Sequence, residues 1–420
     1  MKAMENRARG SAAQHQGAAM KKGWQTKTLA EVCQIKPPKS EARDKVSASS
    51  LVSFLPMEDM GIDVKCVQAT QTKPLSAVVG SYTYFADGDV LLAKITPCFE
   101  NGKLGIADGL KNGIGFGSSE YFVFRPDPTV SKEWLYYFLS RETFRLEGAA
   151  RMSGAVGHKR VSKEFIEEYP IPVPPLAEQQ RIVGLLDEAF EGLATAKANA
   201  EKNLQNAREL FESHLQSVFT QRGPGWKQKT LEEIATTFGR GKSKHRPRNE
   251  PKLYGGKYPF IQTGDIRNAD HFITEYSQTY SELGLAQSKL WPKGTICITI
   301  AANIAETAIL GFDACFPDSV IGVVANPKEA EVGFIEYLLQ SFKARIQALG
   351  KGSAQANINM GTFENERFPF PPIAEQRQIV EKLDSLSEET QRLARLYERK
   401  HAALEALKKS LLHQAFSGEL

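Results

Sequence analysis

A dense group of basic side chains follows Gly239 in the second half of the chain. Its members lie within thirteen residues: Arg240, Lys242, Lys244, His245, Arg246, Arg248 and Lys252. Lysine and arginine contact nucleic-acid phosphates without needing a fixed geometry. The segment therefore predicts phosphate contact, although an exposed loop with no partner has the same composition, and the sequence leaves both open. Its start resembles an ATP-binding P-loop, but Thr236 stands where that motif requires its first glycine, which excludes ATP binding here.

Two further polar segments precede the long stretches described below. The first contains His158, Lys159 and Arg160; the second contains Lys351, Gln355, Asn357 and Asn359. Asparagine and glutamine can pair bidentately with adenine, and lysine or arginine with guanine. Contact with bases or phosphates and a plain turn-rich loop are equally compatible with each segment. We add six basic or polar residues as candidate DNA contacts: Lys94, Thr96, Lys103, Arg151, Gln262 and Asn303.

The sequence predicts neither a catalytic residue nor a metal ligand. It has no HExxH motif and no Asn/Asp-Pro-Pro-aromatic sequence of the kind that amino-methyltransferases use. The five cysteines form no CxxC pair, so neither a zinc site nor a disulfide framework is indicated. Free thiols favour a cytoplasmic protein, and no apolar run approaches the 18 or so residues of a membrane span.

Positive charge is concentrated outside two long segments. The chain carries 53 lysines and arginines against 49 acidic residues, a net charge of +4. Residues 176–220 contain four basic and seven acidic residues, and residues 373–420 contain eight of each, so the rest of the chain carries +7. A positive excess in the globular parts is expected of modules that contact a polyanion.

These two long segments are copies of one another. Pro174-Pro175-Leu176-Ala177-Glu178-Gln179 opens the first, and Pro371-Pro372-Ile373-Ala374-Glu375-Gln376 opens the second, 197 positions later without a gap. Apolar residues recur at steps of three and four in both, which is typical of a coiled-coil helix. The proline pair ends each helix on its N-terminal side. Thr390 and Lys400 interrupt the apolar pattern of the second copy.

The repeat includes the region before each helix, because Gly23-Trp24 and Gly225-Trp226 open similar segments. Each region has two apolar strand candidates and then a short helix candidate, at Lys132 to Leu146 and Val332 to Leu349. We therefore expect an α+β fold: two β-rich globular domains, separated by two long helices that form an antiparallel coiled coil with pseudo-two-fold symmetry. The expected boundaries are 1–20 for a disordered extension, 21–175 and 225–372 for the domains, and 176–224 and 373–420 for the helices.

Two globular units, each ending in Pro-Pro-(Leu/Ile)-Ala-Glu-Gln and a long helix, resemble the specificity subunits of type I restriction-modification enzymes. The last five residues, Phe416-Ser417-Gly418-Glu419-Leu420, are also similar to the ends of such subunits. The resemblance covers residues 21–420. It implies two target recognition domains that read the two halves of a bipartite DNA target. It also implies partners: double-stranded DNA, two methylation subunits and, in the full enzyme, restriction subunits.

The resemblance further implies that this chain binds no cofactor, and that the partner subunits use S-adenosylmethionine, ATP and Mg. The expected function is therefore DNA binding that directs where other subunits methylate or cut, with no catalysis by this chain. Two alternatives stay open at this point. One is a self-contained adenine methyltransferase, and the other is a coiled-coil scaffold that does not bind nucleic acid.

Overall fold

The computed structural model describes residues 21, 23–155, 157–244, 247, 249–301, 304–350, 358 and 360–420. The expected extension 1–20 lies outside these residues. The chain divides into two compact units, which are Met1–Asn199 with Lys400–Leu420, and Ala200–Arg399. Within the described ranges, no helix is both long and apolar enough to cross a membrane.

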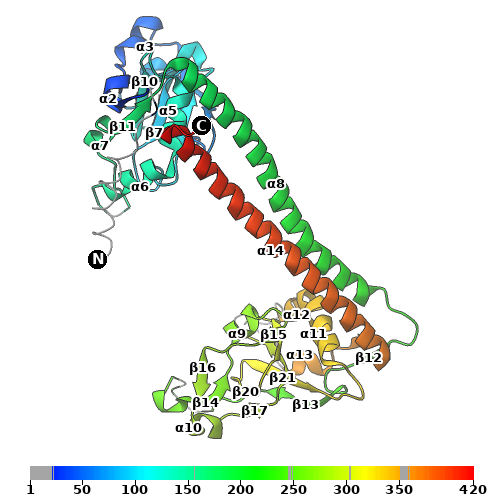
Figure 1. Cartoon of the computed structure of the whole chain (residues 1–420). Coiled ribbons are helices and arrows are strands. Elements are labelled where there is room, and N and C mark those ends of the chain that lie inside the picture. The colour runs from blue at the N-terminus through cyan, green and yellow to red at the C-terminus, as the bar shows by residue number, and fades with distance from the viewer. Residues whose placement is uncertain are drawn as a thin grey trace. The chain divides into compact units, whose positions relative to one another are not determined.

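The first unit is built on two sheets and a short ribbon (Figure 1). A five-stranded sheet has the order β2 (Cys33–Ile35), β10 (Tyr121–Pro126), β7 (Val90–Ala93), β8 (Leu104–Ala107), β4 (Cys66–Val67). A four-stranded sheet has the order β5 (Gln71–Pro74), β3 (Leu51–Leu55), β9 (Ile114–Gly117), β6 (Thr83–Ala86). The ribbon pairs β1 (Gln25–Thr28) with β11 (Pro170–Val173). The short helices of this unit are α2 (Leu29–Val32), α3 (Ser40–Lys45), α4 (Leu75–Val78), α5 (Lys132–Ser140), α6 (Glu142–Ala150) and α7 (Lys163–Glu167).

The second unit repeats this plan strand for strand. Its five-stranded sheet has the order β13 (Ala235–Arg240), β21 (Val320–Ala325), β18 (Ile296–Thr299), β19 (Thr307–Leu310), β15 (Phe272–Ile273). Its four-stranded sheet has the order β16 (Gln278–Tyr280), β14 (Tyr254–Phe260), β20 (Ala314–Cys315), β17 (Leu290–Trp291). Its ribbon pairs β12 (Lys227–Lys229) with β22 (Phe368–Phe370). Its short helices are α9 (Thr263–Asn268), α10 (Glu282–Ala286), α11 (Val332–Ser341), α12 (Lys343–Gly350) and α13 (Met360–Glu364).

Parallel and antiparallel pairings also match between the two units. In both five-stranded sheets three antiparallel pairs are followed by one parallel pair at the far edge. In both four-stranded sheets the single parallel pair is central. The internal repeat expected from the helices therefore extends through the sheets.

Each short helix expected after the strands is in fact two helices. The segment expected as one helix from Lys132 to Leu146 breaks at Arg141, whose backbone is extended (φ −62°, ψ 138°). The Arg141 guanidinium stabilises this break, because its Nε donates to the Phe138 carbonyl oxygen at 3.0 Å and its plane lies over the Phe138 ring. The segment expected from Val332 to Leu349 likewise breaks at Phe342, between α11 and α12.

The two long helices, α8 (Leu176–Thr220) and α14 (Ile373–Ser417), contribute to the core of each unit. In the first unit, Ile182 of α8 and Phe416 of α14 lie in the same buried cluster as Trp134 of α5. The Trp134 and Phe416 ring centroids are 4.4 Å apart. In the second unit, Phe219 and Leu383 share a cluster with Phe334 of α11. The helices are thus built into the domains and are not separate appendages.

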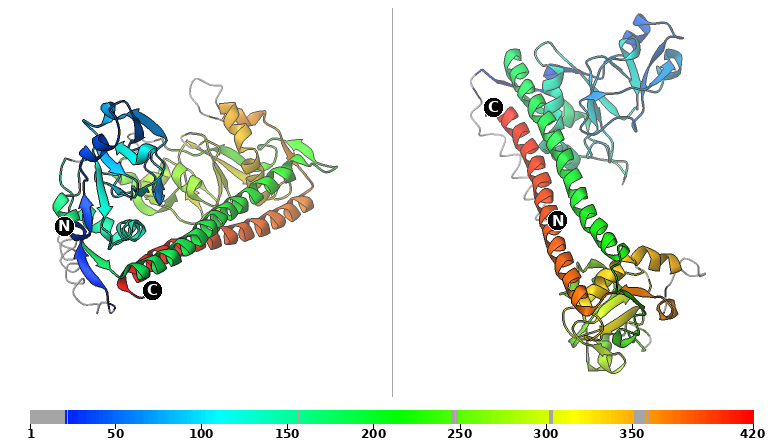
Figure 2. Two further views of the ribbon diagram at one scale, coloured as in Figure 1. Left: turned by 90° about the horizontal axis from the view of Figure 1, so that it is seen from above. Right: turned by 90° about the vertical axis from the view of Figure 1, so that its right-hand side faces the viewer.

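The helices run antiparallel within each unit, as expected. In the first unit Arg181 donates to the Leu420 carbonyl oxygen and Lys197 pairs with Glu405, so the partner number falls as the chain advances. In the second unit Arg208 pairs with Glu398. Figure 2 shows the end of α14, drawn in red, beside the first half of α8 in both views. Thr390 lies within the continuous helix α14, and its buried hydroxyl donates to the Leu386 carbonyl oxygen of the preceding turn.

The glutamine that follows each Pro-Pro pair makes the same contacts in both units. Gln179 is fully buried; its Oε1 accepts from the Ser131 backbone N–H, and its Nε2 donates to the Thr129 and Pro174 carbonyl oxygens. Gln376 makes the equivalent three bonds, with the Glu331 N–H and the Glu329 and Pro371 carbonyl oxygens. Each amide therefore joins the start of a long helix to the turn before α5 or α11.

Candidate nucleic-acid interface

A cavity of about 430 Å³ opens at one end of the five-stranded sheet of the first unit. Lysines and an arginine supply its positive charge: Lys36, Lys39, Lys94, Arg160 and Lys163. Aromatic rings supply much of its wall: Tyr82, Tyr84, Tyr121 and Phe122. Tyr84 and Tyr121 are buried, so Tyr82 and Phe122 are the partly exposed rings beside the basic groups. Basic groups beside exposed aromatic rings are the combination that binds nucleic-acid backbones and bases.

Backbone pairing brings Lys94 and Arg160 together from distant parts of the chain. Lys94 follows β7, and its N–H donates to the Glu120 carbonyl oxygen just before β10. Arg160 lies at the same place, because Ile95 and Ser153 both form bridges with it. The Thr96 N–H donates to the Lys159 carbonyl oxygen, which fixes that register.

One carboxylate, Glu120, sits among these cations. Arg160 donates to it through Nε (2.9 Å) and Nη2 (2.8 Å), and the Lys94 ammonium lies 3.9 Å away. The Arg160 hydrogen bonds hold the pKa of Glu120 below its usual range, so it stays ionised at neutral pH. Burial lowers the pKa of Lys94. Glu167 pairs with Lys163 at 3.0 Å. Since five cations line the cavity against Glu120 and Glu167, the site keeps a positive excess that favours an anionic ligand.

The other candidates of the first unit lie around this cavity or away from it. His158 and Lys159 are exposed on the same turn as Arg160. Thr96 donates to Glu100 at 2.7 Å, and the Arg151 guanidinium lies over the Phe165 ring. Lys103 is not among the cavity residues; its ammonium donates to the Met57 carbonyl oxygen at 2.6 Å, so it ties β8 to a loop.

Sequence reasoning missed Lys36, Lys39 and Lys163. The repeat carried a signal for the first two. Lys36-Pro37-Pro38-Lys39 follows β2, and the basic segment from Arg240 follows β13, which occupies the same edge of the second sheet. Lys36 also has a left-handed backbone (φ 61°), which is uncommon for a residue with a side chain and often marks a functional turn.

In the second unit the described candidates are more dispersed. Arg240 ends β13 and donates through Nε to the Asp318 carbonyl oxygen at 2.7 Å. Lys242 and Lys244 are exposed just beyond it. Gln262 precedes α9, and its side chain donates to the Gln278 side chain at 2.8 Å. Seven candidates lie outside the described residues: Arg246, Arg248, Asn303, Lys351, Gln355, Asn357 and Asn359.

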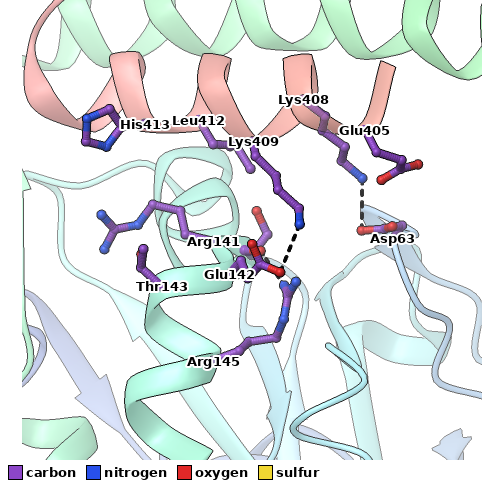
Figure 3. A pocket seen from close by; sticks show the side chains of 11 residues that line it. Asp63, Arg141, Glu142, Thr143, Arg145, Glu405, Lys408, Lys409, Leu412 and His413 are labelled. Carbon is purple, nitrogen blue, oxygen red and sulfur yellow. Dashed lines mark hydrogen bonds and ion pairs between the residues drawn. The ribbon is translucent and has the colours of Figure 1, made fainter. Parts of the chain in front are cut away.

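A second cavity in the first unit lies where α14 is attached to the domain by ion pairs (Figure 3). It has a volume of about 150 Å³ and lies between α14 and the α5–α6 turn. Lys408 pairs with Asp63 at 3.0 Å, and Lys409 pairs with Glu142 at 2.9 Å. These two ion pairs join lysines of α14 to carboxylates of the domain, and so they attach the helix to it.

Comparison with known proteins gives a consistent picture. A family model described as "Type I restriction modification DNA specificity domain" matches residues 21–204 and again residues 224–398. The EcoAI specificity subunit of Escherichia coli is 35% identical over 219 residues, which are 52% of this chain and 35% of that protein. The EcoEI subunit, also from Escherichia coli, is 36% identical over 209 residues, 46% of this chain and 34% of that protein. The matched chain thus spans about a third of the length of these two relatives.

Two solved structures share the fold over nearly the whole chain. The HsdS subunit from Thermoanaerobacter tengcongensis has a TM-score of 0.66 and 19% identity, covering 97% of this chain and 100% of that one. A chain from a type I R-M system, studied for its assembly and conformational transition, has a TM-score of 0.78 and 20% identity, covering 96% and 100%. The α+β architecture with two domains and two long helices is therefore confirmed.

Proposed function

The chain belongs to the family of type I restriction modification DNA specificity domains, and from this membership we propose that it is the DNA-recognition subunit of a type I restriction-modification enzyme. In this proposal each unit binds one half of a bipartite target in double-stranded DNA. The observation that carries the proposal is the double match of the family model, one match on each copy of a repeated fold. The basic, aromatic-lined cavity of the first unit supports it.

The chain works together with catalytic partners in this proposal. Two methylation subunits and, in the full enzyme, restriction subunits assemble with it, and they use S-adenosylmethionine, ATP and Mg. Support comes from the relatives, which are named specificity subunits of restriction enzymes. The chain's own contribution is binding: cations contact phosphates and fix the register, and side chains at the cavity rim contact base edges.

A methylome experiment tests this function. The chain is expressed with its methylation subunits in a host that lacks adenine methylation, and methylated bases are mapped genome-wide. We expect a single bipartite sequence with a fixed gap. The purified chain alone should bind duplex DNA with an affinity that falls steeply as salt rises.

Measurements on the isolated chain and a methylome without the chain separate this function from the two alternatives. Turnover of S-adenosylmethionine by the isolated chain above background would favour a self-contained methyltransferase. Absence of any salt-dependent binding to DNA, together with a methylome that is unchanged when the chain is omitted, would favour a scaffold.

A further inference from the structure

Matched positions of the two units differ in side chain at the rim of the cavity. The Lys94 N–H donates to the Glu120 carbonyl oxygen, and the Ile300 N–H donates to the Ser319 carbonyl oxygen in the same register of the second sheet. Ile300 and Ser319 therefore stand where the first unit has Lys94 and Glu120. The backbone arrangement is the same in both units. The first unit has a charged side chain at each of the two positions, and the second unit has an uncharged side chain at each.

Arg160 is held in one orientation but keeps free donors. A guanidinium has five N–H groups. Within the described part of the chain three are used: two donate to Glu120, and one on Nη1 donates to the His158 carbonyl oxygen at 2.9 Å. One N–H on each terminal nitrogen is left, and 45% of the side chain is exposed. Two donors on neighbouring nitrogens of a planar group match the O6 and N7 acceptors of guanine.

We propose that Arg160, oriented by Glu120, specifies a guanine in the half-site bound by the first unit. Arg160 is the specificity-determining residue, and Glu120 is a positioning residue that keeps the guanidinium plane directed outward. This inference rests on the proposed function, because it assigns one base of the target to one side chain. Lysine can also donate to guanine, but its ammonium on a flexible stem lacks the rigid planar fork that Glu120 orients, so Arg160→Lys loses the fixed geometry of the contact.

The test uses the chain assembled with its methylation subunits. The half-site of the first unit is identified as the half that changes when residues 21–175 are exchanged for those of a relative. Duplexes are then made with each base pair of the target substituted in turn. The ratio of the Kd for each substituted duplex to that of the intact target is measured for the native complex, Arg160→Lys and Glu120→Gln.

We expect both variants to lose discrimination at the same single G·C position. One good bidentate contact corresponds to about a 5- to 150-fold preference. Arg160→Lys keeps the charge, so its salt slope should stay that of the native complex. Glu120→Gln removes a negative charge from the cavity rim, so its binding to unrelated DNA should tighten while discrimination falls.

Arg392→Lys is the matched control. Arg392 makes the same two-bond pair with Glu389 on α14, at 2.9 and 2.6 Å, far from the cavity in the sequence. It should leave discrimination unchanged at every position. Thermal melting of all variants checks that each is folded.

Three outcomes would overturn the inference. They are discrimination that stays native in both variants, a uniform loss of affinity for every sequence in Arg160→Lys, and a first half-site without any G·C pair. Failure of the proposed function is distinguishable, because in that case the native complex itself would show no bipartite target.

Discussion

We predict that phosphate contact in the second unit depends on Arg240, Lys242 and Lys244. Replacing Arg240, Lys242 and Lys244 with alanine should weaken binding to all sequences alike, since phosphates are the same in every sequence. The slope of log K against log salt should fall by roughly one for each phosphate that is no longer neutralised. Fluorescence anisotropy at several salt concentrations measures this.

The matched control removes exposed lysines elsewhere in that unit. Lys227→Ala with Lys328→Ala leaves the segment after β13 intact and should leave the slope nearly unchanged. A change of target sequence at constant slope in the triple variant would show that these residues contact bases instead.

We expect a partly buried histidine, His271, to make the stability of the second unit depend on pH. His271 Nδ1 lies 2.8 Å from the carboxylate of Glu336, which is fully buried, and its ring stacks on Tyr337. Burial lowers the pKa of His271, but the Glu336 carboxylate more than offsets this, so the pKa is raised above 6.5. The folded state therefore holds the proton more tightly than the unfolded state. The stabilisation is complete below about pH 6.5 and is lost as pH rises through the folded pKa.

In the first unit, Lys65 occupies the position that matches His271. The Ile106 N–H donates to the Lys65 carbonyl oxygen as the Ile309 N–H donates to that of His271, and the Lys65 ammonium lies 2.5 Å from Asp187. Urea unfolding from pH 6 to pH 8.5 should show the native chain losing stability relative to His271→Lys. The exposed His158, changed to glutamine, should behave like the native chain. Equal pH profiles for native and His271→Lys would refute this.

The sequence predicted some residues of the cavity but not their bonding. Lys94 and Arg160 were candidates because of their type and of the polar segment around Arg160. Glu120 lies 40 residues before Arg160, and their contact depends on the register of β10 against β7 and on the bridge at Ile95. The periodicity of a sequence predicts strands, but it does not predict which residues of a distant loop pair with them. The ion pair between Glu120 and Arg160 could therefore not be predicted.

At the scale of elements, the long helices and the segments of the short helices were predictable, but the breaks within the short helices were not. Proline pairs and an apolar repeat of three and four predict a long helix from local information alone. The break at Arg141 depends instead on a guanidinium packed between the Phe138 and Phe416 rings. Phe416 belongs to α14, so that environment exists only in the folded chain.

The length of the helix pair offers a prediction of its own. Inserting four helix-forming residues after Ala200 and four after Ala402 should lengthen α8 and α14 together by about 6 Å. We expect the same two half-sites with a gap longer by one or two base pairs, at about 3.4 Å per base pair along one strand. Methylome mapping of a strain that carries the double insertion measures this.

Insertion into α8 alone is the control. Cross-helix pairs such as Lys197–Glu405 and Arg208–Glu398 would then fall out of register, so stability should drop. A double insertion with full activity and an unchanged gap would show that helix length does not set the distance between the half-sites.

At the scale of the whole molecule, the two units share one plan but differ in their rim residues. Exchanging residues 21–175 for the matching part of a relative should therefore change one half of the target only. The other half and the length of the gap should stay as they were. Mapping the methylated sites in the strain with the native chain and in the strain with the exchanged domain tests this prediction. A change in both halves of the target would contradict independent recognition by the two units.

The buried glutamines have an evolutionary consequence. Among the described residues, the Gln179 and Gln376 side chains bond to main-chain N–H and carbonyl groups of the segment before α5 or α11 and of the proline pair. Main-chain atoms are present whatever the side chains are, so this polar joint accepts any sequence that keeps the same turn. Recombination between genes could therefore replace one recognition domain without any compensating change at this joint. New combinations of half-sites would then arise in a single genetic event, faster than point mutation could alter a target base by base.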